Sequence, residues 1–450
     1  MKRLCLILLV ASSVVWPTLT LAAPRPHYGG TLRIAVKESP ASLDTLASSG
    51  PAGLSALVFE NLVRLDERGH PQPLLALSWQ AEPGNQRWRF FLRGGVSFSD
   101  GAPLDSSTVA ASLRNSNSDW KVIAAGETVM IESESPDPDI PAELAMARNA
   151  IVRRSDGKLS GTGPFTIAQW VSGKHLVLAA NEQYWAGRPY LDSIEVEFGK
   201  NYREQMVLLD LNKADVVQVA PESIHRAQAE AKTVTSSQPQ ELMALVFASD
   251  ARSDAEAHAR NALALSIGTP ALNNVILQGG GEPTGALLPN WVSGYAFVFP
   301  SGGTPETVRQ ERTQAQQSPS WTLGHDASDP VAHLAAERIS LNARDAGITL
   351  QLTSSSSSDV RLVRIPLPSS DAHLVLRELA RSLQLPQPKF AGSSVTELYS
   401  AESTLLKTHR VIPLLHIRSA VAARPNVHNW NKLPDGTWNI GDAWLSAEKP

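Results

Sequence analysis

The stretch Gly161-Thr162-Gly163-Pro164-Phe165 opens the part of the chain whose pattern says most about the fold. Phe165 to Trp170 and Leu176 to Ala180 are rich in strand-forming residues and flank the turn pair Ser172-Gly173, which predicts a β-hairpin. Ile194 to Phe198 alternates apolar and polar residues and predicts a further strand. This region is therefore expected to be rich in β-structure.

The chain on the N-terminal side of this stretch predicts both strand and helix. Gly29-Gly30 leads into the alternating run Thr31 to Val36, which predicts a strand. Residues 51–65 carry apolar side chains at helical spacing and predict a helix. The residues on its apolar face are Leu54, Leu57, Val58 and Leu62.

The second half of the chain alternates between helical and strand periodicity. Residues 331–346 predict a helix, because Asp329 can cap its first turn, Pro330 suits that turn and Gly347 can end it. Further helices are predicted at 203–212, 255–266, 372–383 and 395–408, and strands at 216–219, 322–325, 348–352, 360–365 and 411–416. Helices that cross between strands predict a mixed α/β fold.

The composition is that of a globular protein. The chain has 450 residues, of which 42% are apolar, and 40 basic against 44 acidic side chains give a formal net charge of −4. The length suggests about two to four domains. The slightly acidic balance, without a basic cluster, argues against nucleic acid as a partner.

Residues 1–22 are expected to be a secretory signal peptide. Lys2 and Arg3 precede the apolar run Leu4 to Val15, and Ala22 supplies the small residue before cleavage. The run is shorter than the about 20 residues of a bilayer-spanning helix; the alternative is a buried N-terminal helix. Cys5 is the only cysteine and lies inside this leader, so the mature chain is expected to have no disulfide, no Cys-ligated metal and no lipid anchor.

Catalytic motifs are either absent from the sequence or match it no better than expected by chance. The Ser-x-x-Lys spacing at Ser118 to Lys121 recurs at two other places, and no Lys-Thr-Gly follows it. Gly279-Gly280-Gly281 lacks the lysine and hydroxyl residue of a phosphate-binding loop. His325, Asp329 and His333 are four residues apart, but the predicted helix begins after His325, so this histidine falls on another element. We therefore predict no enzyme activity, no metal and no cofactor.

Several blocks, in order along nearly the whole chain after the leader, resemble the extracellular solute-binding protein family 5. This family includes the periplasmic oligopeptide and dipeptide receptors of ABC importers. The most specific blocks are Gly161 to Phe165 and Asn181-Glu182-Gln183-Tyr184-Trp185. The other blocks are Gly29 to Ile34, Ser42 to Asp44, Val58 to Val63, Leu75 to Trp79, Phe98 to Leu104, Arg260 to Leu263 and Ile412 to Leu414.

The resemblance implies an α/β, two-lobed periplasmic-binding-protein-like type II fold with a discontinuous first domain. Lobe I would take residues 24–50, 156–240 and 418–450, a small domain would take 51–155, and lobe II would take 241–417. The lobes would close around a ligand by hinge motion. Most shared blocks would be structural, and the tryptophans in or near them are expected to fill cores rather than stack on a ligand. These are Trp79, Trp88, Trp170 and Trp185.

The sequence departs from the family pattern at two places. Residues 114–160 are shorter than usual, so the small domain is expected to be reduced. The segment that often carries Trp, Asp-Tyr and Asp-Pro in peptide receptors reads Arg361 to Asp371 here and lacks the tryptophan. Asp371 is the only carboxylate of that segment, and it could meet a ligand amine or cap the following helix. The ligand is therefore left open between a peptide and another small polar compound.

Eight residues in loops and at strand ends are candidates for ligand binding. They are Ser48, Ser49, Gly50, Trp291, Tyr295, Arg361, Arg364 and Asp371. The first three occupy the first cleft loop that the resemblance implies, and the two aromatic residues could stack on a ligand. The arginines could meet a carboxylate and the aspartate an amine. The alternative for the arginines is an outward position on an edge strand.

The predicted function is that of a periplasmic substrate-binding protein that delivers a solute to an ABC importer. Its expected partners are a small-molecule or peptide ligand and the permease subunits, and the protein is expected to be a monomer. Two alternatives stay open. One is a non-transporting receptor or scaffold with the same fold, and the other is a periplasmic hydrolase, which needs a nucleophile or metal set that the sequence does not offer.

Overall fold

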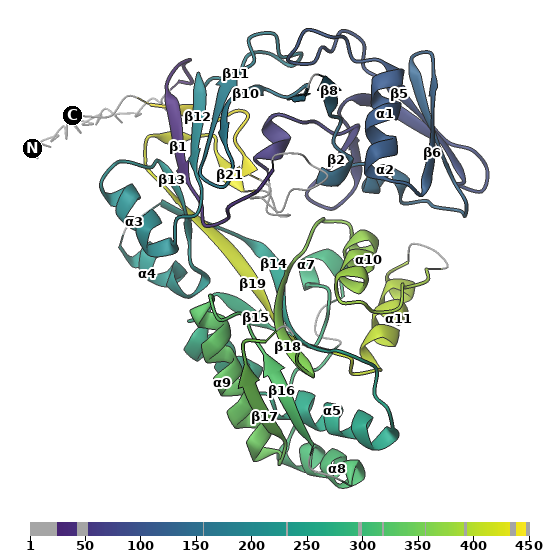
Figure 1. Cartoon of the computed structure of the whole chain (residues 1–450), viewed down its shortest axis with the longest axis vertical. Coiled ribbons are helices and arrows are strands. Elements are labelled where there is room, and N and C mark those ends of the chain that lie inside the picture. The colour runs from purple at the N-terminus through teal and green to yellow at the C-terminus, as the bar shows by residue number, and fades with distance from the viewer. Residues whose placement is uncertain are drawn as a thin grey trace, which may run out of the picture.

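The computed structural model describes residues 25–42, 53–155, 157–230, 233–295, 299–316, 319–355, 357–390, 394–432 and 438–446 of the chain. Two lobes lie one above the other, and a smaller domain sits beside the upper lobe (Figure 1). Strands and helices alternate along the sequence in both lobes. The predicted mixed α/β class is confirmed.

One sheet runs through both lobes. Within the described residues its order is β10-β11-β12-β1-β13-β19-β14-β18-β16-β17, with β15 beside β19. The strands are β1 (Thr31–Ala35), β10 (Phe165–Val171), β11 (His175–Ala180), β12 (Ser193–Glu197), β13 (Val216–Val219), β14 (Thr233–Phe247), β15 (Gly281–Pro283), β16 (Ser320–Gly324), β17 (Thr349–Thr353), β18 (Val360–Pro366) and β19 (Val411–Ala423). β1 is parallel to β12 and β13, and β16 is parallel to β17 and β18, so each lobe contains a parallel segment.

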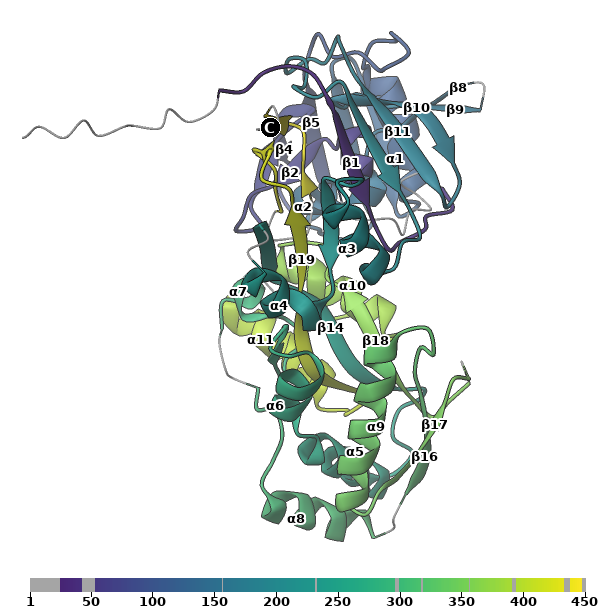
Figure 2. The same ribbon diagram turned by 90° about the vertical axis from the view of Figure 1, so that its left-hand side faces the viewer.

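The long antiparallel strands β14 and β19 carry the sheet from one lobe into the other (Figures 1 and 2). Their lobe I halves pair Thr233–Ser236 with Ala420–Ala423, and β19 also pairs with β13 there. Their lobe II halves pair from Glu241 onward with residues up to Ile417. The register shifts between Ser236 and Glu241, where a bulge interrupts the ladder. The interruption lies where the sheet passes from one lobe into the other.

Helices pack on both lobes. In lobe I, α3 (Tyr202–Asp210) and α4 (Ile224–Ala229) bury Leu209, Ile224 and Ala227 against β13 and β19. In lobe II, α9 has the predicted start, since the Asp329 side chain accepts hydrogen bonds from Val331 and Ala332. The lobe II helices are α5 (Asp254–Ser266), α6 (Thr269–Ala271) with the π-helical turn η4 (Leu272–Ile276), α7 (Asn290–Ser293), α8 (Pro305–Ala315), α9 (Pro330–Asp345), α10 (Ala372–Ser382) and α11 (Val395–Leu406).

The small domain has its own sheet and core. Its four-stranded sheet has the order β4-β5-β7-β6, and α1 packs on it around Val109, Leu113 and Phe90. Its elements are β2 (Val63–Leu65), β3 (Pro71–Pro73), β4 (Ala76–Ala81), β5 (Arg87–Leu92), α1 (Ser106–Ser116), β6 (Trp120–Ala125), β7 (Thr128–Ser133), α2 (Ile140–Glu143), the 3₁₀ turn η2 (Ala147–Asn149), β8 (Arg153–Ser155) and β9 (Lys158–Ser160).

The helix predicted over 51–65 is wrong for its described part. That part forms one 3₁₀ turn, η1 (Ser55–Leu57), followed by extended chain and β2. The apolar residues are buried as predicted, but Leu54 to Phe59 insert into the core of lobe I. The Val58 carbonyl accepts a hydrogen bond from the Gly163 amide at 3.0 Å, and a Cβ at Gly161 would overlap the same carbonyl. This tertiary contact overrides the local helical spacing.

The tryptophans of the shared blocks pack as predicted. Trp79, Trp88 and Trp185 lie against the small-domain core, and Trp170 lies against the lobe I core. The end of the described chain also returns to lobe I, where Trp438 is buried. The remaining short elements are the 3₁₀ turn η3 (Pro221–Ser223) and the strands β20 (Val427–His428), β21 (Asn431–Lys432), β22 (Trp438–Asn439) and β23 (Trp444–Leu445).

Candidate ligand-binding site

Polar residues follow the carboxyl ends of parallel strands in both lobes. Lys37 and Glu38 follow the carboxyl end of β1, and His325 and Asp326 follow the carboxyl end of β16. Ligands of open α/β sheets bind outside such strand ends. Hydrogen bonds from Ser328, helped by the charges of Lys37 and His325, lower the pKa of Asp326. A lobe I cation is therefore within electrostatic range of a lobe II carboxylate.

A hydrogen-bonded set of polar side chains supports the lobe I side. The Gln218 side-chain oxygen accepts from the Lys37 amide at 2.7 Å, and its nitrogen donates to the Glu38 carboxylate at 2.7 Å. Gln205 is fully buried and donates to the same Gln218 oxygen at 3.3 Å. The Lys37 ammonium lies 5.5 Å from the centre of the Tyr202 ring. These contacts fix the direction in which the chain leaves β1.

Arg364 dominates the lobe II side. Its guanidinium donates to both Glu241 oxygens at 3.0 and 2.6 Å and to Asp329 at 2.8 Å. Burial alone would lower the pKa of Arg364, but Glu241 and Asp329 raise it above its ordinary value. Burial raises the pKa of Tyr202, on which the charge of Arg364 also acts, so the two lobes meet near this group. Because two carboxylates already satisfy the guanidinium, a ligand carboxylate would have to compete with them.

The other candidates in the Arg361 to Asp371 segment have different surroundings. Arg361 is exposed on β18, but β18 lies between β14 and β16, so the alternative of an edge strand is wrong. The Asp371 side chain accepts from the Leu374 amide at 2.9 Å and caps α10. This contact is the one that the capping alternative predicts. Ligand binding by these residues stays a prediction.

Trp291 and Tyr295 contact lobe II and the crossing strands. The Trp291 indole donates to the Pro239 carbonyl at 2.8 Å, at the bulge of β14. The Tyr295 hydroxyl hydrogen-bonds to Glu402, and its ring contacts those of Phe299 and Tyr399 edge-on. In this structure both residues hold the segment after the glycine-rich loop in place. Ser48, Ser49 and Gly50 lie outside the described residues.

Glu402 is a buried carboxylate on α11 beneath this segment. It accepts hydrogen bonds from the Leu287 amide and, at 3.0 Å, from the Leu288 amide, in addition to the Tyr295 hydroxyl. Burial raises the pKa of Glu402 to about 7, although these hydrogen bonds act in the opposite direction. The Leu287 carbonyl lies 3.1 Å from the buried His416 ring nitrogen. Glu402 therefore holds the backbone of lobe II in place, and its hydrogen bonds leave it unsuited to contact a ligand.

The three residues considered for a metal do not converge. His325 and His333 face each other with ring nitrogens 3.0 Å apart. Asp329 instead caps α9 with one oxygen and binds Arg364 with the other. Within the described residues, no group of three or more His, Cys, Asp or Glu side chains has the geometry of a metal site.

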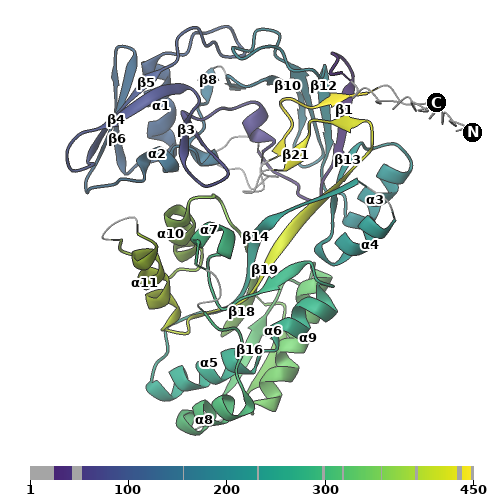
Figure 3. The ribbon, with the colours of Figure 1, turned by 180° about the vertical axis from the view of Figure 1, so that it is seen from behind.

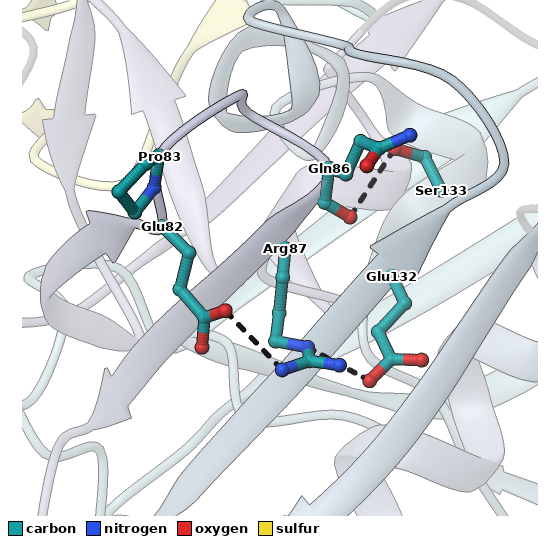
Figure 4. Close-up of a pocket in the computed structure, with 6 residues that line it drawn as sticks. All are labelled: Glu82, Pro83, Gln86, Arg87, Glu132 and Ser133. Atoms are coloured by element: carbon teal, nitrogen blue, oxygen red, sulfur yellow. Dashed lines mark hydrogen bonds and ion pairs between the residues drawn. The ribbon is translucent and has the colours of Figure 1, made fainter.

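Two surface hollows are each lined by residues from one part of the fold. One, of about 260 Å³, lies at the β4–β5 turn of the small domain (Figure 4). There Arg87 pairs with Glu82 at 3.2 Å and with Glu132 at 2.9 Å, so the charged side chains that line this hollow already pair with one another. The other, of about 330 Å³, lies along α3 and is lined by Lys200, Asn201, Arg203, Glu204, Val207 and Leu208. Neither hollow contains residues from both lobes.

The sequence did not identify Lys37, Tyr202 or Glu241 as candidates. Lys37 carried a usable signal, because it directly follows the predicted strand ending at Val36. Tyr202 and Glu241 carried none, since only the pairing of distant strands brings their elements to the junction of the lobes.

The family model for bacterial extracellular solute-binding proteins, family 5 (Middle), matches residues 70–366. The chain therefore belongs to the bacterial extracellular solute-binding proteins of family 5. The chain is similar to the probable D,D-dipeptide-binding periplasmic protein DdpA of Escherichia coli K12. The two are 22% identical over 317 residues, which are 64% of this chain and 61% of that protein. The chain spans only 28%, 36% and 61% of the lengths of the first three curated relatives.

Solved structures confirm the two-lobed fold. The oligopeptide-binding protein AppA of Bacillus subtilis, in complex with a nonapeptide, superposes with a TM-score of 0.78 at 16% identity, over 94% of this chain and 100% of that one. NikA of Staphylococcus aureus, in complex with Ni(L-His)2, gives a TM-score of 0.76 at 17% identity, over 92% and 100%. These likenesses establish the fold and leave the ligand open. Among the described residues, no helix has the length and apolar character needed to cross a membrane.

Proposed function

We propose that the protein is a periplasmic substrate-binding protein that delivers a small polar solute or a peptide to an ABC importer. The observation that carries this proposal is the pair of strands β14 and β19, which joins two lobes through a register shift. Such a connection lets the lobes move as bodies, and a ligand that contacts both of them stabilises the closed state. Binding alone, without catalysis, is sufficient for this role.

The proposed ligand position is the junction of the lobes. Lobe I contributes Lys37 and Tyr202, and lobe II contributes Asp326 and the Arg364 cluster. The mixture of both charge signs fits a small polar or zwitterionic solute. The names of relatives support peptides as one class, since DdpA is a probable dipeptide receptor and AppA was solved with a nonapeptide.

The assembly and the domain limits are also proposals. We propose a monomer that docks on permease subunits after cleavage of residues 1–22. We propose that lobe I consists of residues 24–50, 156–240 and 418–450, the small domain of residues 51–155 and lobe II of residues 241–417. The separate cores of the three parts support this division, although Leu54 to Phe59 pack with lobe I.

Native mass spectrometry of the protein purified from a periplasm without denaturation tests the proposal. We expect a discrete mass increment that is lost on unfolding, and the increment gives the mass of the solute directly. Lys37→Ala should reduce the bound fraction, because it removes the lobe I cation, whereas the exposed Lys158→Ala is the matched control. A bare mass, with no rise in melting temperature in a panel of peptides, sugars and metal chelates, would contradict the proposal.

A further inference from the structure

The small domain packs directly on α10 of lobe II (Figures 1 and 3). Leu374 of α10 is 1% exposed and lies in one apolar cluster with Ala142 and Met146, which are also buried. Leu65 of β2 packs against the same cluster. The contact therefore excludes water between two parts that are far apart in the sequence.

Ion pairs also join the two parts: in one the cation comes from α10, and in the other it comes from the small domain. Arg377 of α10 lies 3.3 Å from Asp139 and 3.7 Å from Asp137, which both precede α2. The next residue of the same helix, Glu378, lies 3.3 Å from Arg148 of the small domain. All of these side chains are at most 27% exposed. Because each side presents one cation and at least one anion, the pairing also fixes the register of the contact.

The backbone meets at a second point, at the start of α10. Gly69, in the turn between β2 and β3, has a positive φ of +80°, and a Cβ there would lie 2.6 Å from the Ser370 carbonyl oxygen. The Ser370 hydroxyl is 3.4 Å from the Asp66 carbonyl. The turn and the loop before α10 are thus in van der Waals contact. A ligand that lay between these two segments would have to separate them.

We propose that this contact is a latch that holds lobe II against the small domain before any ligand is bound. We define the latch as Leu65, Ala142, Met146, Leu374, the ion pairs of Arg377 and Arg148, and the Gly69–Ser370 contact. It shifts the equilibrium between open and closed forms toward the closed form, so a ligand has to supply less of that shift. Only this consequence rests on the proposed function, because the contact itself is formed by residues of the small domain and of α10.

Electron–electron double resonance on the protein alone tests the latch. Cys5 is the only cysteine and lies in the leader that we propose is cleaved, so two nitroxides can be placed on the mature protein through Ser118→Cys in the small domain and Lys407→Cys at the end of α11, both exposed. We expect one short, narrow distance distribution without ligand. Arg148→Ala combined with Arg377→Ala should add a second population at longer distance.

The control is Arg381→Ala in the same background. Arg381 lies on α10, is 60% exposed and pairs with Glu378 inside that helix. The control should keep the short distance. A long distance in the labelled protein before mutation, or the same short distance in the double variant and the control, would overturn the latch. If the double variant does not fold, the distance is measured instead in 1 M salt with all ion-pair residues unchanged. Partly exposed ion pairs are screened at that salt, so the absence of a longer-distance population would overturn the latch. None of these results depends on whether the protein feeds an importer.

Discussion

Glu60 shows at the scale of one residue why the shared blocks occur together. It is 5% exposed, and its carboxylate accepts hydrogen bonds from Thr162 at 2.8 Å, Tyr184 at 2.8 Å and the Trp185 indole at 2.9 Å. Burial raises the pKa of Glu60 despite these bonds. Three donors from two distant segments thus converge on one acceptor, which ties the start of the small domain to lobe I. The two most specific stretches of the sequence are structural partners of this carboxylate.

Glu402 gives a prediction about pH. Its pKa is about 7 in the folded protein, against an ordinary value of 4.5, so the folded state binds the proton more tightly than the unfolded state. Its contribution to stability is therefore complete below pH 4.5 and is lost as pH rises through 7. We expect the free energy of unfolding, compared with that of Glu402→Gln, to fall by about 2–3 kcal/mol between pH 4.5 and pH 8.

Urea unfolding at a series of pH values measures this difference. Both proteins share every other titrating group, so subtraction isolates the Glu402 carboxyl. Glu397→Gln on the same helix is the control, since Glu397 belongs to the exposed capping box of α11. Parallel pH profiles for the wild-type protein and Glu402→Gln would contradict the prediction.

At the scale of elements, the close packing of residues 54–60 on the segment before β10 gives a second prediction. Gly161 has no positive φ, so its role is to leave space for the Val58 carbonyl and the Phe59 ring. Gly161→Ala should therefore destabilise the protein by about 3 kcal/mol, the upper part of the usual range for overpacked sites, because backbone atoms lie on the opposing side. Gly94→Ala is the matched control, because nothing lies within 4 Å of its added Cβ.

Thermal and urea unfolding of the two alanine variants provide the measurement. Gly94→Ala should stay within about 1 kcal/mol of the wild-type protein. If Gly161→Ala were equally mild, residues 54–60 would not be held by this contact, and the explanation for the missing helix would fail.

Local signals predicted the elements whose ends are defined by nearby residues. Asp329, Pro330 and Gly347 set the ends of α9 within one residue, because caps act over three or four positions. β14 was not predicted at all, and β19 was predicted for about half its length. Both strands pass through a bulge and change their neighbours along their length, which only the whole sheet determines.

The candidate site was less predictable than the fold. A sequence pattern can place Arg364 on a strand, but it does not show that Glu241, 123 residues away, already binds the guanidinium. Asp371 was predicted with two possible roles, and the structure shows the capping contact. The junction residue Tyr202 depends on the packing of α3 against a strand from another segment, so no local signal marks it.

At the scale of the whole molecule, β19 couples the two lobes. It lies between β13 of lobe I and β14, and its lobe II half contributes Leu414 to the lobe II core. Leu414→Ala should lower the free energy of unfolding by about 2–5 kcal/mol. Because the strand is shared, hydrogen exchange should show lost protection in β13 of lobe I as well as in β18 of lobe II.

Mass-spectrometric hydrogen exchange resolves the two lobes in one experiment. The control is Leu405→Ala on α11, which is buried in a lobe II cluster that includes β19 only through Val411, at the lobe II end of the strand. It should expose lobe II amides and leave β13 protected. Protection lost only in lobe II for Leu414→Ala would show that the lobes unfold independently.

The central position of β19 also governs when the native structure can form. The first 410 residues precede this strand in the 450-residue chain, yet β19 stands in the middle of the sheet that both lobes share. A polypeptide emerging amino-terminus first cannot join its two lobes until β19 has been made. Such late, non-local pairing folds slowly. Until β19 has been made, the apolar faces of the two lobes therefore lack the strand that joins them, and such incompletely paired chains are prone to aggregate.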